Sequence, residues 1–364
     1  MKKIITIFTI TVLSLTVYSQ SYHFSRDTFL IPSNSICGFF EEPTGIYFYW
    51  FNPSFINDGI HFYKETKGDF SPYKNIKFST EILDAYRNRS ISLASLVFIS
   101  FDTVLSITDK EIVMLDFKKG KILQRITYNT DSNYSLSLSD NQQNMWNPQR
   151  RSLAFRLYYI GEYVNKREQY YTGQLAAEVF PEKGVVNKFP MEYPVMNIFK
   201  YSSIISNLFY PNITFNGDTY VVGFLIIPLT YEYNVKSNKL ETKNVCEEGY
   251  IPLPNYENSM LDSTYYEDVK IGSWLMAHTR IYNRLIYDSY THRYYRFFSQ
   301  QKNENGKTSV QGVSIFDNQW QMIGKNIIFD SPVSVYYPTS KGIYGYTSDF
   351  GFGIIINKLE IIEK

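Results

Sequence analysis

One short module recurs along this chain, and it restricts the possible folds more than any other feature of the sequence. Each copy has a strand of alternating apolar residues, a polar turn rich in Lys, Gly or Asn, and a second alternating strand. The clearest copy spans Glu111 to Tyr128, where EIVMLDF and ILQRITY flank the turn KKGK. Further copies turn at Gly68, at Gly184, near Asn238 and near Asn318. Glycine and Asn suit these positions because hairpin turns often need a positive φ.

The spacing of the turns predicts how the hairpins assemble. The turn centres at 68, 120, 184, 238 and 318 are 52, 64, 54 and 80 residues apart, and the run GFGIIINKLEII indicates one more apolar strand. A hairpin cannot bury both of its faces alone, so hairpins at such intervals favour radially stacked four-stranded sheets. We therefore expect an all-β fold, a β-propeller with six blades, or with seven if the widest interval hides a degenerate blade. A β-sandwich built from the same hairpins is the alternative.

The widest interval contains the segment from His278 to Phe298, which predicts two strands joined at Tyr290, Thr291 and His292. We take these strands as the first half of a blade that VSIFDNQW and IGKNIIF complete. The apolar run from Val221 to Leu229, which contains Pro228, predicts one buried strand.

The composition agrees with strands and excludes one class of partner. The 33 Tyr and 27 Phe, with many Ile, Val and Thr, fit pleated and half-buried surfaces. The 36 basic and 35 acidic side chains leave a net charge of +1, which gives no electrostatic reason to bind nucleic acid. A chain of 364 residues can also bury a large core.

The N-terminus has the pattern of a secretory signal peptide over residues 1–19. A basic start at Lys2 and Lys3 precedes an apolar run that ends at Tyr18, and cleavage after Ser19 would leave Gln20 first. The run is too short to span a membrane, and no later segment reaches spanning length. We expect one propeller domain over 20–364, exported to the periplasm or the extracellular space and soluble after cleavage. No lipobox cysteine follows the leader.

The chain has two cysteines, Cys37 and Cys246. Export makes a disulfide between them chemically possible, but their separation of 209 residues means that only the fold could bring them together. Two buried, unpaired thiols are the alternative.

Complete catalytic motifs are absent from the sequence. The four histidines form no HExxH pair, and the Gly306-Lys307-Thr308 element lacks the earlier glycine of a phosphate-binding loop. Sialidase boxes and DxDxDG calcium loops are absent as well. Asp116 and Asp317 end apolar strands, where we expect them to accept hydrogen bonds from turn amides. We therefore predict no cofactor and no metal site.

Two clusters are candidate binding residues. In the strand Arg293-Tyr294-Tyr295-Arg296, alternation puts Arg293 with Tyr295 on one face and Tyr294 with Arg296 on the other. Each face could hold an anionic or sugar-like ligand by stacking and hydrogen bonding, or could lock neighbouring blades together.

The second cluster is the polar loop from Ser139 to Arg151. Such loops lie at one end of a propeller or near its channel, where Trp146 with Arg150 and Arg151 could grip a ligand; alternatively, the Trp could anchor a long connection to the sheet. Trp274 and Arg280 allow the same two interpretations.

The stretch from about Trp274 to Tyr346 resembles a known family. Its segments HRYYRFF, VSIFDNQWQMIG and PTSKGIYGY are similar to the C-terminal blades of exported, TolB-like six-bladed β-propellers of Bacteroidetes-type bacteria. The Lys2-Lys3 start and the Ser19-Gln20 junction resemble leaders of the same bacteria. Many members are lipoproteins, whereas this chain lacks the lipidation cysteine. The resemblance implies a fold and a compartment, and it supplies no catalytic residues because the family's function is unknown.

Together these features predict an exported, non-enzymatic propeller that recognises a protein or glycan partner through loops at one end of the ring or through its channel. The main alternative is an envelope hydrolase or lyase with carboxylates and arginines at the channel. A structural component of a surface assembly is the third interpretation.

Overall fold

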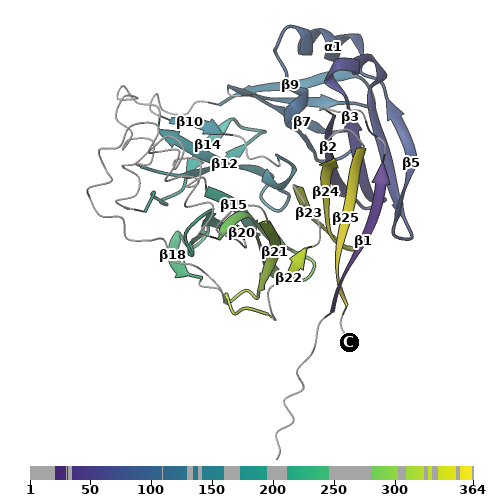
Figure 1. Cartoon of the computed structure of the whole chain (residues 1–364). Helices are drawn as coiled ribbons and strands as arrows, with labels where there is room; N and C mark the ends of the chain where they lie inside the picture. The colour runs from purple at the N-terminus through teal and green to yellow at the C-terminus, as the bar shows by residue number, and fades with distance from the viewer. Residues whose placement is uncertain are drawn as a thin grey trace, which may run out of the picture.

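The protein is a six-bladed β-propeller. The computed structural model describes residues 21–29, 31, 35–108, 110–128, 134–137, 142–159, 173–194, 211–245, 280–301, 309–323, 327–329, 335–349 and 353–362. These residues form six antiparallel sheets arranged around a ring (Figure 1). The predicted all-β class and the six-blade count are confirmed, and the β-sandwich alternative is wrong.

The first three blades follow one another along the chain, and each begins with its innermost strand. Blade 1 contains β2 (Ile36–Glu42), β3 (Gly45–Phe51), β4 (Ile60–Thr66) and β5 (Asp69–Ile76), with the 3-10 helix η1 (Pro53–Asp58) between β3 and β4. Blade 2 contains β6 (Leu96–Phe98), β7 (Val104–Ile107), β8 (Glu111–Asp116) and β9 (Lys121–Thr127), and is preceded by α1 (Thr80–Arg87) and η2 (Leu93–Ser95). Blade 3 contains β10 (Tyr134–Ser137), β11 (Trp146–Asn147), β12 (Ser152–Tyr159), β13 (Ala176–Phe180) and β14 (Val185–Lys188).

The remaining blades complete the ring. Blade 4 contains β15 (Pro211–Asn216), β16 (Thr219–Phe224), β17 (Leu229–Asn234) and β18 (Lys239–Asn244). Blade 5 contains β19 (Ile281–Asp288), β20 (Arg293–Gln301), β21 (Ser309–Phe316) and β22 (Ile327–Phe329). Blade 6 contains β23 (Val335–Thr339), β24 (Gly342–Asp349), β25 (Gly353–Ile362) and β1 (Ser21–Phe29).

The five hairpins predicted from the sequence are the third and fourth strands of five successive blades. They correspond to β4–β5, β8–β9, β13–β14, β17–β18 and β21–β22. The segment from His278 to Phe298 provides β19 and β20 of blade 5, as predicted, although its first two residues lie outside the described part of the chain. The single strand predicted over Val221 to Leu229 is wrong, because β16 ends at Phe224 and a bend, followed by Pro228, separates it from β17.

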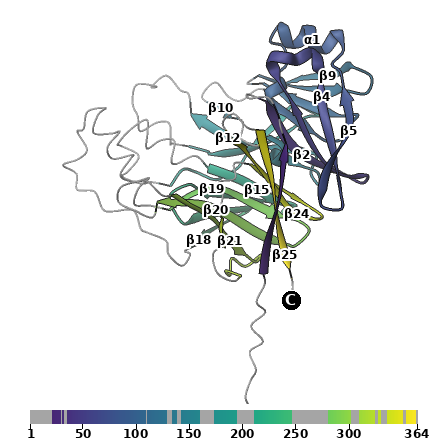
Figure 2. The ribbon, with the colours of Figure 1, turned by 45° about the vertical axis from the view of Figure 1, so that its right-hand side comes forward.

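Blade 6 joins the two ends of the described chain. β1 runs antiparallel beside β25, from the pair Ser21 and Ile362 to the pair Phe29 and Ile354 (Figures 1 and 2). The N-terminal strand is thus the outer strand of the last blade and closes the ring.

The inner strand of blade 3 is interrupted. Both β10 and β11 pair with β12, at separate positions along that strand. The 3-10 helix η3 (Gln142–Met145) directly precedes β11 and contacts the inner strands β2, β6 and β15 of three other blades. Asn144 Nδ2 also donates to the Tyr336 carbonyl oxygen of blade 6 at 2.8 Å. The helix η3 therefore lies within the central channel.

Aromatic side chains fill much of the space between blades. Phe40 of blade 1, for example, stacks on Tyr47 and on Phe98 of blade 2, with ring centroids 5.2 and 4.8 Å apart. Such packing accounts for the aromatic-rich composition, because each blade must bury both of its faces. Among the described residues, no helix is long and apolar enough to cross a membrane.

Candidate functional site

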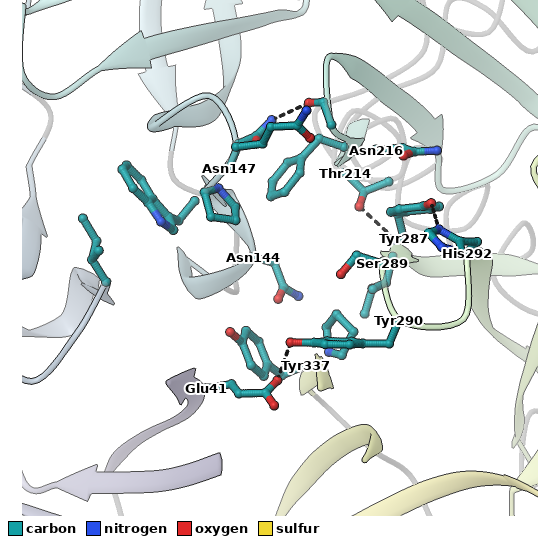
Figure 3. Close-up of a pocket in the computed structure, with 18 of the residues that line it drawn as sticks. Glu41, Asn144, Asn147, Thr214, Asn216, Tyr287, Ser289, Tyr290, His292 and Tyr337 are labelled. Carbon is teal, nitrogen blue, oxygen red and sulfur yellow. Dashed lines mark hydrogen bonds between the residues drawn. The ribbon is translucent and has the colours of Figure 1, made fainter. Parts of the chain in front are cut away.

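A cavity of about 410 Å³ lies at one end of the central channel. Every blade contributes to its lining, from the end of its inner strand or from the turn that leads to the second strand. The contributions in blade order include Glu41, Ile99, Trp146, Phe215, Tyr290 and Tyr337. We call this cavity the channel pocket. Figure 3 shows its polar and aromatic side chains converging on one space.

Three blades meet through the carboxylate of Glu41 at the edge of the pocket. The Tyr290 hydroxyl in the β19–β20 turn donates to Glu41 Oε2 at 2.6 Å, as Figure 3 shows. The Ser340 amide of blade 6 donates to the same oxygen at 3.0 Å, and the Ser340 hydroxyl donates to Oε1. Glu41 therefore fixes the Tyr290 ring, which is 51% exposed.

Two further contacts hold the turn that carries Tyr290. The Tyr287 hydroxyl and His292 Nδ1 lie 3.0 Å apart, and the Tyr287 amide donates to Thr214 Oγ1 of blade 4 at 2.9 Å. Burial raises the pKa of Tyr287, so its hydroxyl keeps its proton at neutral pH. The second of these contacts joins blades 4 and 5 at the pocket wall.

Amide side chains supply most of the remaining polar groups. Asn144, Asn147 and Asn216 all line the pocket, as does Gln149. Asn147 Nδ2 donates to the Gly217 carbonyl oxygen at 2.8 Å, so this amide joins blades 3 and 4. These groups offer both donors and acceptors without a charge.

Glu41 is the one carboxylate in the described lining, and neither Lys nor Arg contributes to it. In blade 5, Asp288 is the acidic residue nearest in sequence to the lining residue Tyr290, but its carboxylate points into the β19–β20 turn. Its oxygens accept from the Tyr290 amide at 2.9 Å and from the Thr291 hydroxyl at 2.7 Å. Burial raises the pKa of Asp288, although these hydrogen bonds oppose the effect. A pair of carboxylates facing one substrate is therefore absent from the described pocket.

Trp146 lies in the wall of the channel pocket, whereas Arg150 points into a buried cluster between blades 3 and 4. Arg150 binds both oxygens of Glu178, at 2.8 and 2.9 Å, and donates to Asp218 at 3.0 Å. Arg151 is exposed and pairs with Glu182. Of the three loop residues singled out in the sequence, only the Trp faces the pocket.

The cluster around Glu178 is fully hydrogen-bonded. Its Oε2 accepts from the hydroxyls of Tyr220 at 2.8 Å and Ser152 at 3.2 Å, and its Oε1 accepts from Asn187 at 3.3 Å. Burial alone would raise the pKa of Glu178, but the hydrogen bonds from Arg150, Tyr220 and Asn187 outweigh it and lower the pKa. This carboxylate therefore stays charged and holds two blades together.

The strand Arg293-Tyr294-Tyr295-Arg296 lies in β20, and its side chains alternate as expected. Tyr295 packs in the core cluster toward blade 6, while Tyr294 and Arg296 face blade 4. Arg296 is 1% exposed and donates to three backbone carbonyls of blade 4. Arg293 is half-buried opposite Asp288. Arg296 thus occupies the blade-locking position that the sequence left open as an alternative to ligand binding.

The other sequence candidates lie away from the pocket or outside the described residues. Arg280 is 5% exposed, and it contacts Gln300 and the face of the Phe298 ring at 4.1 Å. Trp274 and Cys246 lie outside the described residues. Cys37 is buried and has no disulfide partner among the described residues, and because Cys246 lies outside them, the pairing of the two cysteines stays a prediction.

Metal-ligating clusters are absent from the described part of the chain, where no group of three His, Cys, Asp or Glu converges. The two strand-ending aspartates act within their turns, as the sequence suggested. Asp116 accepts from the Lys119 amide at 2.8 Å, and Asp317 accepts from the Gln319 and Gln321 amides at 2.8 Å each.

Sequence reasoning missed the pocket residues Glu41, Asn144 and Tyr337. A usable signal exists, since they lie at the ends of inner strands or in insertions next to them. These positions become recognisable only once the inner strands have been assigned. Tyr290 was placed correctly in a turn, but its role in the channel depends on Glu41 of another blade.

Comparisons with known proteins support the fold and do not identify a function. No protein-family model and no curated protein matches the chain. Among solved structures, a member of the duf4221 family from Bacteroides vulgatus is 14% identical, with a TM-score of 0.64, over 94% of this chain and 99% of that one. A protein from Bacteroides fragilis described as exported is 8% identical, with a TM-score of 0.47, over 94% and 95% of the two chains.

The β-propeller domain of Cps50 (Swd1) from Myceliophteria thermophila is 11% identical, with a TM-score of 0.38, over 93% of this chain and 100% of that one. The likeness to the duf4221 protein, with 14% identity and a TM-score of 0.64, shows a fold alone. The resemblance to Bacteroides proteins is confirmed at the level of that fold, and the TolB-like assignment stays a prediction.

Proposed function

We propose that this protein is an exported binding protein that holds a small polar partner in the channel pocket. The observation that carries the proposal is the composition of the pocket, in which residues of all six blades, mainly aromatic rings, amides and hydroxyls, surround one space of about 410 Å³. Pockets of this size with a few convergent polar groups are the usual form of small-molecule sites. The N-terminal leader pattern supports export.

The pocket supports binding better than hydrolysis. Hydrolysis of a glycosidic bond by paired carboxylates needs two such groups about 5 to 10 Å apart across the substrate. The described lining offers Glu41 alone, and its oxygens already accept hydrogen bonds from Tyr290 and Ser340. A group held in this way is suited to positioning a neighbour and not to transferring a proton.

Native mass spectrometry of the mature chain, residues 20–364, tests this function. The protein is incubated separately with an oligosaccharide mixture and a tryptic peptide mixture, and the bound and free species are weighed. We expect the parent protein to bind a component of one mixture and to release it with unchanged mass. Tyr290→Ala should lose this binding, and Tyr73→Ala should keep it. Tyr73 is the matched control because it is also 51% exposed but lies outside the pocket. Accumulation of a product of altered mass, or equal binding by both variants, would contradict the proposal.

A further inference from the structure

The Tyr290 ring has the properties of a stacking platform. It is 51% exposed, yet its hydroxyl is tied to Glu41 and its turn is braced by Tyr287 and Thr214. Ordering a tyrosine on a ligand normally costs side-chain entropy, and the hydrogen bond to Glu41 already restrains this ring before a ligand binds. Figure 3 shows Tyr290 extending to Glu41 with Tyr337 beside it. An apolar ring face is thus presented in a fixed orientation next to polar groups.

The polar groups around this ring are mostly uncharged and both donate and accept. Asn144 uses Nδ2 on the Tyr336 carbonyl, and its amide oxygen has no hydrogen bond to another described residue. The Ser289 hydroxyl and the Gln149 amide line the same cavity. Hydroxyl groups of a sugar ring also donate and accept, so they match this set, whereas a purely apolar ligand would leave these groups unpaired.

The charge of the pocket further limits the class of ligand that it can bind. The described lining has one carboxylate and neither Lys nor Arg, and the imidazole of His292 is its one basic side chain, so an anionic ligand would lack the Lys or Arg partner that anion sites normally use. Arg150, next to the lining residue Gln149, is committed to Glu178 and Asp218. A cationic ligand would need a free carboxylate, but Glu41 already accepts from the Tyr290 hydroxyl and from the Ser340 amide and hydroxyl. About four acceptor positions exist on a carboxylate, so little capacity remains.

We propose that the channel pocket binds a neutral saccharide of one or two residues, whose ring stacks on Tyr290 while its hydroxyls bond to Asn144, Ser289 and Gln149. The inference rests on the proposed binding function and names the ligand class for the same site. A volume of about 410 Å³ lies at the low end for small-molecule pockets, which sets the limit of one or two sugar rings.

Titration calorimetry of the mature chain tests the inference. The neutral probes are glucose, galactose, mannose, xylose, N-acetylglucosamine, maltose and cellobiose, and the charged probes are glucuronic acid, N-acetylneuraminic acid and glucosamine. We expect at least one neutral probe to bind, with an affinity that changes less than two-fold between about 50 and 500 mM salt. Tyr290→Ala should weaken it about ten-fold or more, and Tyr73→Ala less than two-fold.

Each other outcome overturns a defined part of the reasoning. A preference of more than ten-fold for a charged probe would overturn the inference that the ligand is neutral. If a peptide binds, no saccharide binds, and Tyr290→Ala weakens the peptide binding, the saccharide inference is overturned but the binding function stands. Absence of any ligand from both the calorimetry and the mass spectrometry would overturn the binding function itself. Tyr290→Phe, which keeps the ring and loses the bond to Glu41, should bind more weakly than the parent and more tightly than Tyr290→Ala.

Discussion

Replacing Arg296 tests whether this buried guanidinium locks two blades together. It donates to the carbonyl oxygens of Val245 at 3.2 Å, Phe224 at 3.3 Å and Ile227 at 2.7 Å, all in blade 4. Its guanidinium carbon also lies 3.5 Å from the centre of the Tyr282 ring. Arg296→Met keeps most of the aliphatic volume but removes all of these polar contacts.

The expected loss follows from the three carbonyls that the variant leaves buried. A hydrogen bond from a charged donor contributes about 1.5–3 kcal/mol, and an unsatisfied buried acceptor costs about 1–3 kcal/mol. Because contacts within one cluster are not additive, we expect a total loss of about 3–5 kcal/mol in the free energy of unfolding. At about 2 °C per kcal/mol for a large domain, the midpoint of thermal unfolding should fall by roughly 8 °C.

Circular dichroism melts of the mature chain provide the measurement. Arg87→Met is the control, because Arg87 is exposed on α1 and its 3.2 Å pair with Asp84 should contribute less than about 1 kcal/mol. Arg296→Lys, which keeps the charge but not the planar fork, should lie between the parent and Arg296→Met. A midpoint for Arg296→Met within about 2 °C of the parent would refute the reasoning, and lost ligand binding with an unchanged melt would return Arg296 to the candidate site.

The carboxylates of Glu178 and Glu232 should contribute to stability with opposite signs at neutral pH. Replacing Gly59 should cost more stability than replacing Gly68. The pKa of Glu178 is lowered, so its stabilisation is present above about pH 4.5 and lost as the pH falls; Glu178→Gln should lower the melting midpoint at pH 7 and flatten its decline below pH 4.5. Burial raises the pKa of Glu232, so its charge is a cost above about pH 4.5; Glu232→Gln should raise the midpoint at pH 7 and have little effect at pH 4. Gly59 has φ 82° and a Cβ there would collide with the Ile76 carbonyl oxygen, whereas Gly68 has φ 99° and open space; urea unfolding should show a loss of about 3 kcal/mol for Gly59→Ala and about 1 kcal/mol for Gly68→Ala.

Much of the fold could be predicted because its signal is local. Alternation within a strand and a glycine or asparagine in the next turn are neighbours in the sequence, so five outer hairpins were recognised with their turns. The strand over Ser21–Phe29 was not predicted, since its partner is β25 at the other end of the chain. Register between such distant segments leaves no pattern within either one.

The site was harder to predict for the same physical reason. The residues that line the channel pocket come from six blades. They are not separated by a fixed number of residues, so the sequence has no pattern that would group them. Alternation correctly separated the two faces around Arg296, but only the structure shows that the neighbouring blade offers three carbonyls to this side chain. Trp146 was singled out because it lies in a polar loop, and the interruption of the blade 3 inner strand explains why that loop reaches the channel.

The pairing of β1 with β25 also sets an order of events during synthesis. A nascent chain emerges from its N-terminus, so Ser21–Phe29 is made first and must remain without its partner until Gly353–Ile362 has been made. Its unpaired edge can meanwhile attract other extended chains. The ring can therefore be sealed only after β25 has been synthesised, and a chain truncated upstream of β25 would leave β1 unpaired in an open blade.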